Sequence, residues 1–307
     1  MQDTSMRLVI RVARTTLSVS TISADGSVNF IPYVVKSGVS MAANMREAFK
    51  TEPALQKSYA KAVVMVESPV LMVPTDLYEE DDCNMIYAHS FPELTSDAVL
   101  TNVLPDLSAV ALFSVNKDLR MVITDHLPSA RFICAVAPVW RYLHRRSFTG
   151  ARNKLYGYFH DKRLDVFSFN QNRFKFCNSF DSANAHDSLY FLLYVWKQLM
   201  LKPEHDEIHL VGDIPERDWI LAELKRYLQR AYIINPSGDF NRSPVAHIKG
   251  MPYDLMTYFI KGRCCNANNY RTIQGSPLRY TTNFQGPTHN RLCQGEYLQC
   301  AQWLYRL

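Results

Sequence analysis

The chain has 307 residues, of which 47% are hydrophobic and 21% are charged. This is the composition of a globular protein long enough for two domains, and it excludes intrinsic disorder and collagen-like repeats. No stretch approaches the roughly 18 consecutive apolar residues that a membrane span requires, and the N-terminus lacks the basic start and apolar run of a signal peptide. We therefore expect a cytoplasmic protein without a membrane span.

Charge and cysteine are distributed unevenly along the chain. Residues 263–307 hold five arginines, no lysine and one acid, so +4 of the net charge of +5 lies there and the rest of the chain carries only +1. Because the body is close to neutral, we do not expect it to bind nucleic acid. Cys83, Cys134 and Cys177 stand apart in apolar or strand-like surroundings and are expected to be reduced core thiols.

The first part of the chain has the pattern of three strands, a helix and a fourth strand. Alternating apolar residues predict an antiparallel meander with strands near residues 8–12, 17–21 and 28–30. Ser40 can cap a helix that turns Met41, Met45 and Phe49 toward the core. The apolar run at residues 61–67 suits a buried strand.

The same order of strands and helix begins again near Asn153. Three strands are predicted at residues 155–159, 164–169 and 173–176. A helix, a strand, a helix, a strand and a last helix follow, near residues 182–200, 207–212, 215–228, 232–234 and 252–260. A unit of βββαβαβ that occurs twice is typical of two ribonuclease-H-like domains in an α/β protein with mixed sheets.

These patterns divide the chain into a first domain at residues 1–150, a second at 151–262 and an irregular tail at 263–307. An insertion is expected in the first domain at about residues 68–108. Within it, Pro74 to Leu77 open a helix that runs through the acidic residues Glu79 to Asp82. We interpret the acidic run as a solvated helix N-terminus, where the helix dipole favours negative charge, and not as a metal site.

The element order over residues 6–262 resembles the actin-like ATPase superfamily, which includes actin, sugar kinases, Hsp70 and pilus-assembly scaffolds. More specific matches lie at residues 69–74 with Leu77-Tyr78, at Phe240–Ser243 and at Pro252–Met256. They are similar to a bacterial family with an assigned actin-like fold and no assigned activity. The resemblance implies a duplicated ribonuclease-H-like, actin-like ATPase fold with an inserted subdomain.

The superfamily holds nucleotide between two hairpin turns, each with an Asp followed by Gly and small or hydroxyl residues, because glycine lets backbone N–H groups close around phosphates. The matching hairpins here, at residues 11–17 and 159–165, contain no glycine. The resemblance therefore implies weakened ATP chemistry, and a nucleotide-free scaffold fits the sequence better.

Four residues would form the cofactor site if the protein does bind nucleotide. Asp161 or Asp165 could stand where an acid orients magnesium, although a polar turn is the ordinary interpretation. Gly212 and Asp213 resemble the glycine turn on the adenosine side, with only one glycine. ATP and magnesium are expected only under this alternative, and otherwise we expect no cofactor.

Other motifs point to ordinary structure. No phosphate-binding loop, serine-hydrolase elbow or zinc-protease helix is present, so no catalytic residue is assigned. His186 and Asp187 are interpreted as first-turn polar residues rather than an acid–base pair, and the basic run 141–146 as a solvated helix end rather than a nucleic-acid surface. The tail holds zinc-type residues, but their spacing fits no standard ligand set and no metal is expected: Cys264, Cys265, His289, Cys293 and Cys300.

The composition of the tail suggests that it is not native structure. With synonymous codons chosen freely, residues 266–307 can be encoded so that the frame displaced by one nucleotide gives a peptide opening with Met. That peptide resembles the N-terminus of a small-subunit ribosomal RNA guanine methyltransferase, including an ARPTTD-type motif. We therefore hypothesise an out-of-frame reading of a neighbouring gene. Stop codons in the displaced frame of the underlying DNA would exclude it.

Three functions are consistent with the sequence. The leading hypothesis is a non-catalytic actin-like scaffold or binding module that contacts an unknown protein partner through its interdomain cleft or inserted subdomain. The alternative is a divergent ATP-binding phosphotransferase or ATPase that uses the cleft. A further alternative is an accessory to ribosomal RNA modification, suggested by the apparent gene neighbour and the basic run at 141–146.

Deletion of everything after Gly262 should leave the thermal midpoint of unfolding unchanged or higher. Apart from residues 297–307 the tail has no sustained apolar stripe, so it buries too little surface to offset roughly 1–2 kcal/mol of backbone entropy per ordered residue. Thermal denaturation of the full and truncated chains measures this. A fall of several degrees on deletion would mean that the tail packs against the body.

Overall fold

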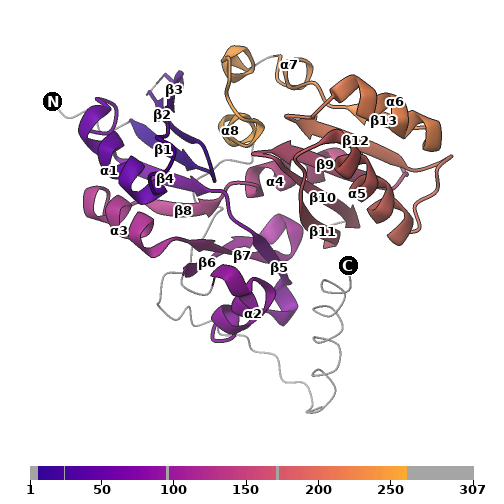
Figure 1. Cartoon of the computed structure of the whole chain (residues 1–307), viewed down its shortest axis with the longest axis horizontal. Coiled ribbons are helices and arrows are strands. Elements are labelled where there is room, and N and C mark those ends of the chain that lie inside the picture. The colour runs from indigo at the N-terminus through magenta and orange to yellow at the C-terminus, as the bar shows by residue number, and fades with distance from the viewer. Residues whose placement is uncertain (1–5, 24, 95–96, 171–172, 242, 261–307) are drawn as a thin grey trace.

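The computed structural model describes residues 6–260, apart from residues 24, 95–96, 171–172 and 242. In this part of the chain, two five-stranded sheets lie side by side with a smaller three-stranded sheet below them in the view of Figure 1. No helix among the described residues has the length and apolar character needed to cross a membrane. The predicted tail at residues 263–307, with its candidate zinc residues, lies outside the described residues.

The first five-stranded sheet has the strand order β3-β2-β1-β4-β8. The first three strands form the predicted antiparallel meander, and β4 and β8 continue the sheet in parallel. The strands are β1 (Arg7–Val12), β2 (Leu17–Ile22), β3 (Val28–Tyr33), β4 (Lys61–Val66) and β8 (Arg131–Cys134). The helices of this half are α1 (Met41–Thr51), α3 (Lys117–His126) and α4 (Ala137–Ser147). The predicted cap is confirmed, because the Ser40 side chain accepts a hydrogen bond from Ala43 N.

The second five-stranded sheet repeats this order as β11-β10-β9-β12-β13. Three antiparallel strands are again followed by two parallel ones. The strands are β9 (Lys154–His160), β10 (Arg163–Asn170), β11 (Arg173–Asp181), β12 (Glu207–Gly212) and β13 (Ala231–Ile233). The helices are α5 (Ala185–Gln198), α6 (Arg217–Tyr227), α7 (Pro236–Asp239) and α8 (Tyr253–Phe259). The repeated topology confirms the duplicated α/β fold.

A three-stranded antiparallel sheet of order β5-β7-β6 is inserted between β4 and α3. Its strands are β5 (Val70–Pro74), β6 (Ala98–Leu104) and β7 (Ala109–Val115). The inserted segment also contains the helix α2 (Cys83–Ser90) and short 3₁₀ turns at Thr75–Leu77, Pro92–Leu94 and Pro105–Leu107. The helix predicted through Glu79–Asp82 is wrong. The backbone becomes extended again at Tyr78, the acids occupy an exposed turn, and α2 begins only at Cys83. The insertion is predicted to end at about Ser108, but its last strand, β7, extends to Val115.

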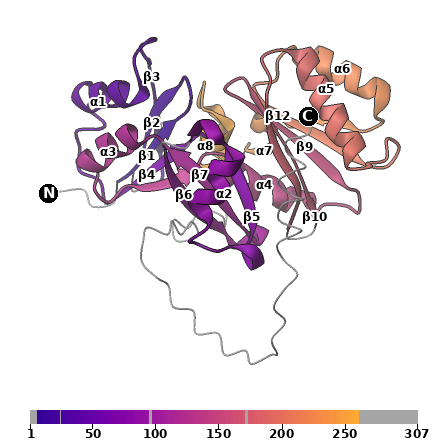
Figure 2. The ribbon, with the colours of Figure 1, turned by 60° about the horizontal axis from the view of Figure 1, so that its bottom comes forward.

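One hydrophobic core joins the two halves. It contains the first sheet with α1, α3 and α4, and it continues through α4 and α8 to one face of the second sheet. Trp140 of α4 makes edge-to-face contacts with Phe167 of β10 and Phe174 of β11, at centroid distances of 6.4 and 5.2 Å. Figure 2 shows α4 and α8 between the sheets. The other face of the second sheet forms a separate core with α5 and α6.

The basic run 141–146 lies at the end of α4, as predicted, but within it only Arg145 is exposed, so the prediction that the run is solvated is wrong for the rest. Arg141 is buried and its Nε donates to Asp106 Oδ2 at 2.7 Å. Arg146 Nη1 lies 2.5 Å from Asp239 Oδ2 of α7. Because α4 packs between the two sheets, basic side chains that would otherwise face water tie α4 to the insertion and to the C-terminal helices.

Replacement of Gly212 by Ala should destabilise the protein by more than about 1 kcal/mol. Gly212 has φ +96°, and a Cβ there would lie 2.0 Å from the carbonyl oxygen of Phe159 on the paired strand β9. Gly238→Ala is the matched control, because a Cβ there meets nothing within 4 Å. Chemical denaturation compares the two variants. Equal free energies of unfolding would show that β12 does not need this close approach.

Candidate functional site

The hairpin turns of the two halves meet at the centre of the molecule. The turn between β1 and β2 carries Arg14 and Thr16, and the two-residue turn between β9 and β10 consists of Asp161 and Lys162. Both Asp161 (φ 45°) and Lys162 (φ 61°) adopt the left-handed conformation that glycine favours. Such a backbone persists only where surrounding contacts hold it, and the Asp161 side chain is held from the opposite hairpin.

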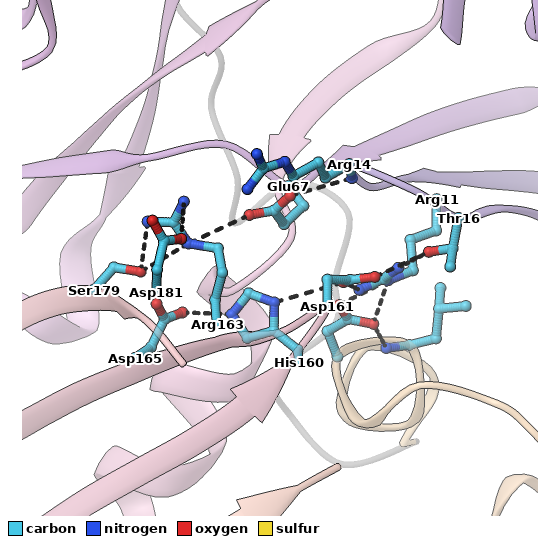
Figure 3. Close-up of polar contacts among 12 residues, drawn as sticks. Arg11, Arg14, Thr16, Glu67, His160, Asp161, Arg163, Asp165, Ser179 and Asp181 are labelled. Carbon is cyan, nitrogen blue, oxygen red and sulfur yellow. Dashed lines mark hydrogen bonds and ion pairs between the residues drawn. The ribbon is translucent and has the colours of Figure 1, made fainter. Parts of the chain in front are cut away.

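Arg11, on the central strand β1, joins three parts of the fold. Its Nε donates to both carboxylate oxygens of Asp254 on α8, at 2.9 and 2.8 Å. Its Nη2 donates to Asp161 Oδ2 at 2.8 Å, and its Nη1 donates to Thr16 Oγ1 at 3.0 Å. Thr16 Oγ1 in turn donates to Asp161 Oδ1 at 3.2 Å. The guanidinium therefore links the first hairpin to the second hairpin and to α8, as Figure 3 shows.

The charges of this cluster are buried and compensated. The Arg11 side chain is 3% exposed and that of Asp254 is 1% exposed. Burial disfavours the charge of Arg11, but Asp254 and Asp161 outweigh that effect and raise its pKa. Burial likewise opposes ionisation of Asp161, yet hydrogen bonding with His160 and the Arg11 charge hold its pKa well below the usual range.

His160 extends the cluster along β9. Its Nε2 lies 2.9 Å from Asp165 Oδ2 on β10, and its Nδ1 lies 3.6 Å from Asp161 Oδ2. Burial alone would lower the pKa of His160, but the charge of Asp165, the contact with the Asp161 carboxylate and the hydrogen bond to Asp165 raise it to about 10. Burial also opposes ionisation of Asp165, and the His160 charge holds the pKa of that carboxyl below its usual value. His160 is therefore an imidazolium at neutral pH.

A second layer of polar groups closes the cluster toward the inserted sheet. Glu67, directly after β4, accepts from Arg14 N at 3.3 Å, and its Oε1 lies 3.9 Å from Arg163 Nε. Arg163 also donates from Nε and Nη2 to Ser179 Oγ, at 3.1 and 3.0 Å. Burial raises the pKa of Glu67, although the charges of His160 and Arg163 oppose that shift.

A small cavity lies against this cluster. Its volume is about 30 Å³. Its walls come from both halves: the segment after β4, the start of α4, and strands β9, β10 and β11. Glu67, His160, Arg163, Asp165 and Asp254 are among its lining residues. A space of this size is sufficient for a water-sized molecule.

The structure brings two of the four sequence-predicted site residues into the cluster. Asp161 and Asp165 lie on either side of His160, and their carboxylates are engaged with Arg11 and His160. Gly212 and Asp213 are exposed at the end of β12, where Asp213 N donates to Phe159 O at 2.9 Å. Partial burial, and after it the charge of Asp161, raise the pKa of Asp213.

Other candidate residues have local structural roles. Asn184 caps α5 by accepting from Asp187 N at 2.8 Å, which agrees with the first-turn interpretation of His186 and Asp187. Among residues 6–260 with their gaps, no group of three or more His, Cys, Asp or Glu side chains has the geometry to hold a metal ion. Cys83, Cys134 and Cys177 are free thiols; Cys83 and Cys134 are fully buried and Cys177 is partly exposed.

Sequence reasoning missed the roles of Arg11, Glu67, His160 and Asp254. One signal was available for Arg11, because it is the charged residue within a run of otherwise apolar side chains in a central strand. A charge in such a strand requires a partner. Its main partner, Asp254, lies 243 positions away in the sequence, so nothing local identifies it.

Comparison with known proteins places the chain in a family and a fold. Residues 1–230 match the family described as "Protein of unknown function (DUF3822)". No curated protein matches the chain. A crystal structure of a Bacteroides thetaiotaomicron protein with an actin-like ATPase fold and unknown function superposes with a TM-score of 0.72 and 25% identity. The match covers 80% of this chain and 97% of that chain, and it confirms the actin-like ATPase fold.

Two more distant structures are also similar. The PilM–PilN type IV pilus biogenesis complex matches with a TM-score of 0.45 and 11% identity, over 76% of this chain and 89% of that chain. The ethanolamine utilization protein EutJ from Carboxydothermus hydrogenoformans matches with a TM-score of 0.39 and 8% identity, over 74% and 84% of the two chains.

Replacement of Arg11 by Met should destabilise the protein by about 3–5 kcal/mol, because it leaves Asp161 and Asp254 buried without their partner. Arg173→Met is the matched control. Arg173 pairs with Asp76 at 3.5 Å, but these side chains are 65% and 57% exposed, so its loss should cost less than about 1 kcal/mol. Urea denaturation measures both. Similar small effects would show that the Arg11 cluster does not hold the halves together.

The stability of the protein should fall as pH rises from about 7 to 10. The pKa of His160 is raised from 6.5 to about 10 on folding, so its contribution is fully present below 6.5 and is lost as pH rises through 10. The slope in this window is at most about 1.4 kcal/mol per pH unit. His160→Gln removes this titration, so the fall should be shallower in that variant. Parallel curves of unfolding free energy against pH would contradict the assignment of the charge to His160.

Proposed function

We propose that this protein, which belongs to the DUF3822 family, is a non-catalytic actin-like scaffold or binding module. One observation carries the proposal. The two hairpins that correspond to the nucleotide-binding turns of the superfamily are joined directly by Arg11, Thr16 and Asp161. Protein atoms thus occupy the space between the turns in which phosphates would have to lie.

The electrostatics of the cluster support the same proposal. A magnesium-orienting acid must offer a free carboxylate to the metal or its water ligands. Asp161 is engaged by Arg11 and Thr16, and Asp165 by His160. Binding of magnesium would require these contacts to break, which would leave the buried Arg11 paired with Asp254 alone and take Asp165 away from the buried His160. The penalty for an unpaired buried charge is several kcal/mol.

The turns also lack the backbone geometry of a phosphate site. Successive N–H groups that converge on one point make an anion-binding concavity, and glycine allows the approach. In the first turn Arg14 N is engaged by the Glu67 carboxylate and Ala13 N by Thr16 O. At the end of β12, Gly212 is required by the nearby Phe159 carbonyl, which gives it a reason other than adenosine binding.

The inserted sheet is the surface that we propose for a protein partner. Met85 on α2 is 65% exposed and Leu77 is 45% exposed, on either side in sequence of the exposed acidic turn Glu79–Asp82. Apolar and acidic side chains together can serve a partner with basic and apolar groups. With the hairpins joined, the insertion is a more accessible contact surface than the space between them.

Titration calorimetry with ATP and magnesium tests the proposal against the ATPase alternative. We expect no binding tighter than millimolar, because the joined hairpins leave no room for phosphates. Tighter binding that is lost in Asp165→Ala and kept in Asp181→Ala would overturn the scaffold proposal. Asp181 is the control because its side chain is 80% exposed at the end of β11. Circular dichroism of both variants verifies that they remain folded.

A further inference from the structure

The cavity beside the Arg11 cluster is lined by buried polar groups that the protein leaves without partners. Trp140 and Tyr158 are each 1% exposed, and both line the cavity. Among the described residues, neither Trp140 Nε1 nor Tyr158 Oη has a hydrogen-bond partner. His160 also lines the cavity, but its Nε2 contacts Asp165 and its Nδ1 faces Asp161, 3.6 Å from Oδ2. Two residues with an unpartnered polar atom thus line one space.

Buried polar groups without a hydrogen bond are rare in folded proteins, since each costs about 1–3 kcal/mol. Two at the same cavity therefore point to an occupant. The occupant must be small, because the cavity volume is about 30 Å³. A site of about 10–15 Å³ or more with two to four polar partners is sufficient for a buried water molecule.

The mixed charge of the walls selects the kind of occupant. Trp140 and the protonated His160 offer donors only, and Tyr158 can donate or accept. The carboxylates of Glu67, Asp165 and Asp254 line the same cavity. An anion would meet these carboxylates, and a cation would meet the charges of His160 and Arg163. A neutral molecule that both accepts and donates satisfies the two sets of groups together.

We propose that this cavity is a structural water site that connects the two halves of the protein. The water accepts from the Trp140 indole on α4, in the first half, and bonds to the Tyr158 hydroxyl on β9, in the second half. It thereby completes the polar interface that begins with Arg11. The proposal does not depend on whether nucleotide binds elsewhere in the molecule.

The chain supplies matched controls for both aromatic residues. Tyr156 lies two positions before Tyr158 on β9, is also 1% exposed and also has an unpartnered hydroxyl, but it does not line this cavity. Trp196 of α5 is 4% exposed with an unpartnered indole nitrogen, and it too lies away from this cavity. Each control therefore differs from its counterpart chiefly in access to the proposed water.

Thermal denaturation of the full chain with Tyr158→Phe and Tyr156→Phe tests the site. Removal of a hydroxyl that bonds water should lower the melting temperature by about 2–4 °C, whereas removal of an unbonded hydroxyl should leave it unchanged or raise it. Only Tyr158→Phe should show the fall. Equal shifts in the two variants, or a fall confined to Tyr156→Phe, would overturn the proposal.

A second measurement uses the wild-type protein and so is independent of variant folding. Magnetisation transfer from water to the indole N–H groups should give a direct cross-peak for Trp140 with the sign of a long-lived bound water. Trp196 should give none. Absence of the Trp140 signal, or a crystal structure with an ion or no density in the cavity, would overturn the proposal.

Discussion

A guanidinium buried in the middle of the molecule constrains the rest of this structure. Arg11 lies on a central strand with its side chain 3% exposed, and it cannot lose its proton under any ordinary condition. Such a charge is tolerated only where acids and hydrogen bonds surround it. Asp161 and Asp254 meet that requirement, and they come from the second hairpin and from α8. The first strand of the protein is therefore compatible with one placement of the second half and of the last described helix.

Buried ion pairs are weak evidence of net stability, because desolvation offsets much of the attraction. Their effect here is better understood as selection among arrangements. The apolar core that joins the halves, formed by residues such as Trp140, Phe167 and Leu255, is not directional and would tolerate small shifts. The bifurcated contact of Arg11 Nε with Asp254 does not tolerate such shifts, because both oxygens lie within 2.9 Å of one nitrogen. The apolar core thus supplies most of the attraction between the halves, and the charged cluster fixes their register.

The sequence predicts the repeated meanders because their strands alternate regularly and are separated by polar turns, and it predicts the cap at Ser40 from local chemistry alone. It does not locate β8, which has four residues, or the strands of the expected insertion, where β5 ends in a proline and is followed by an acidic run that resembles a helix start. The sequence likewise predicts only part of the candidate site. The resemblance of the hairpins draws attention to Asp161 and Asp165, and their neighbour His160 is close in sequence to both. The contacts of Asp161 with Arg11 and Thr16 become evident only when residues far apart in sequence are brought together. The burial of the basic run on α4 is likewise a consequence of tertiary packing.

The direction of the pKa shifts in the Arg11 cluster indicates whether the link between the two halves can respond to pH. Folding raises the pKa values of His160 and Arg11 and lowers those of Asp161 and Asp165, so all four groups keep their charges across the neutral range. The cluster then acts as a constant link and not as a switch. A ligand can open or close two halves only through a difference in its affinity for the two states. An opening that separates Arg11 from Asp161 breaks a buried ion pair, so a ligand would have to offset that loss before any conformational change appeared. A binding module of constant shape, whose partner recognises a fixed surface such as the inserted sheet, is the function most consistent with an interface built in this way.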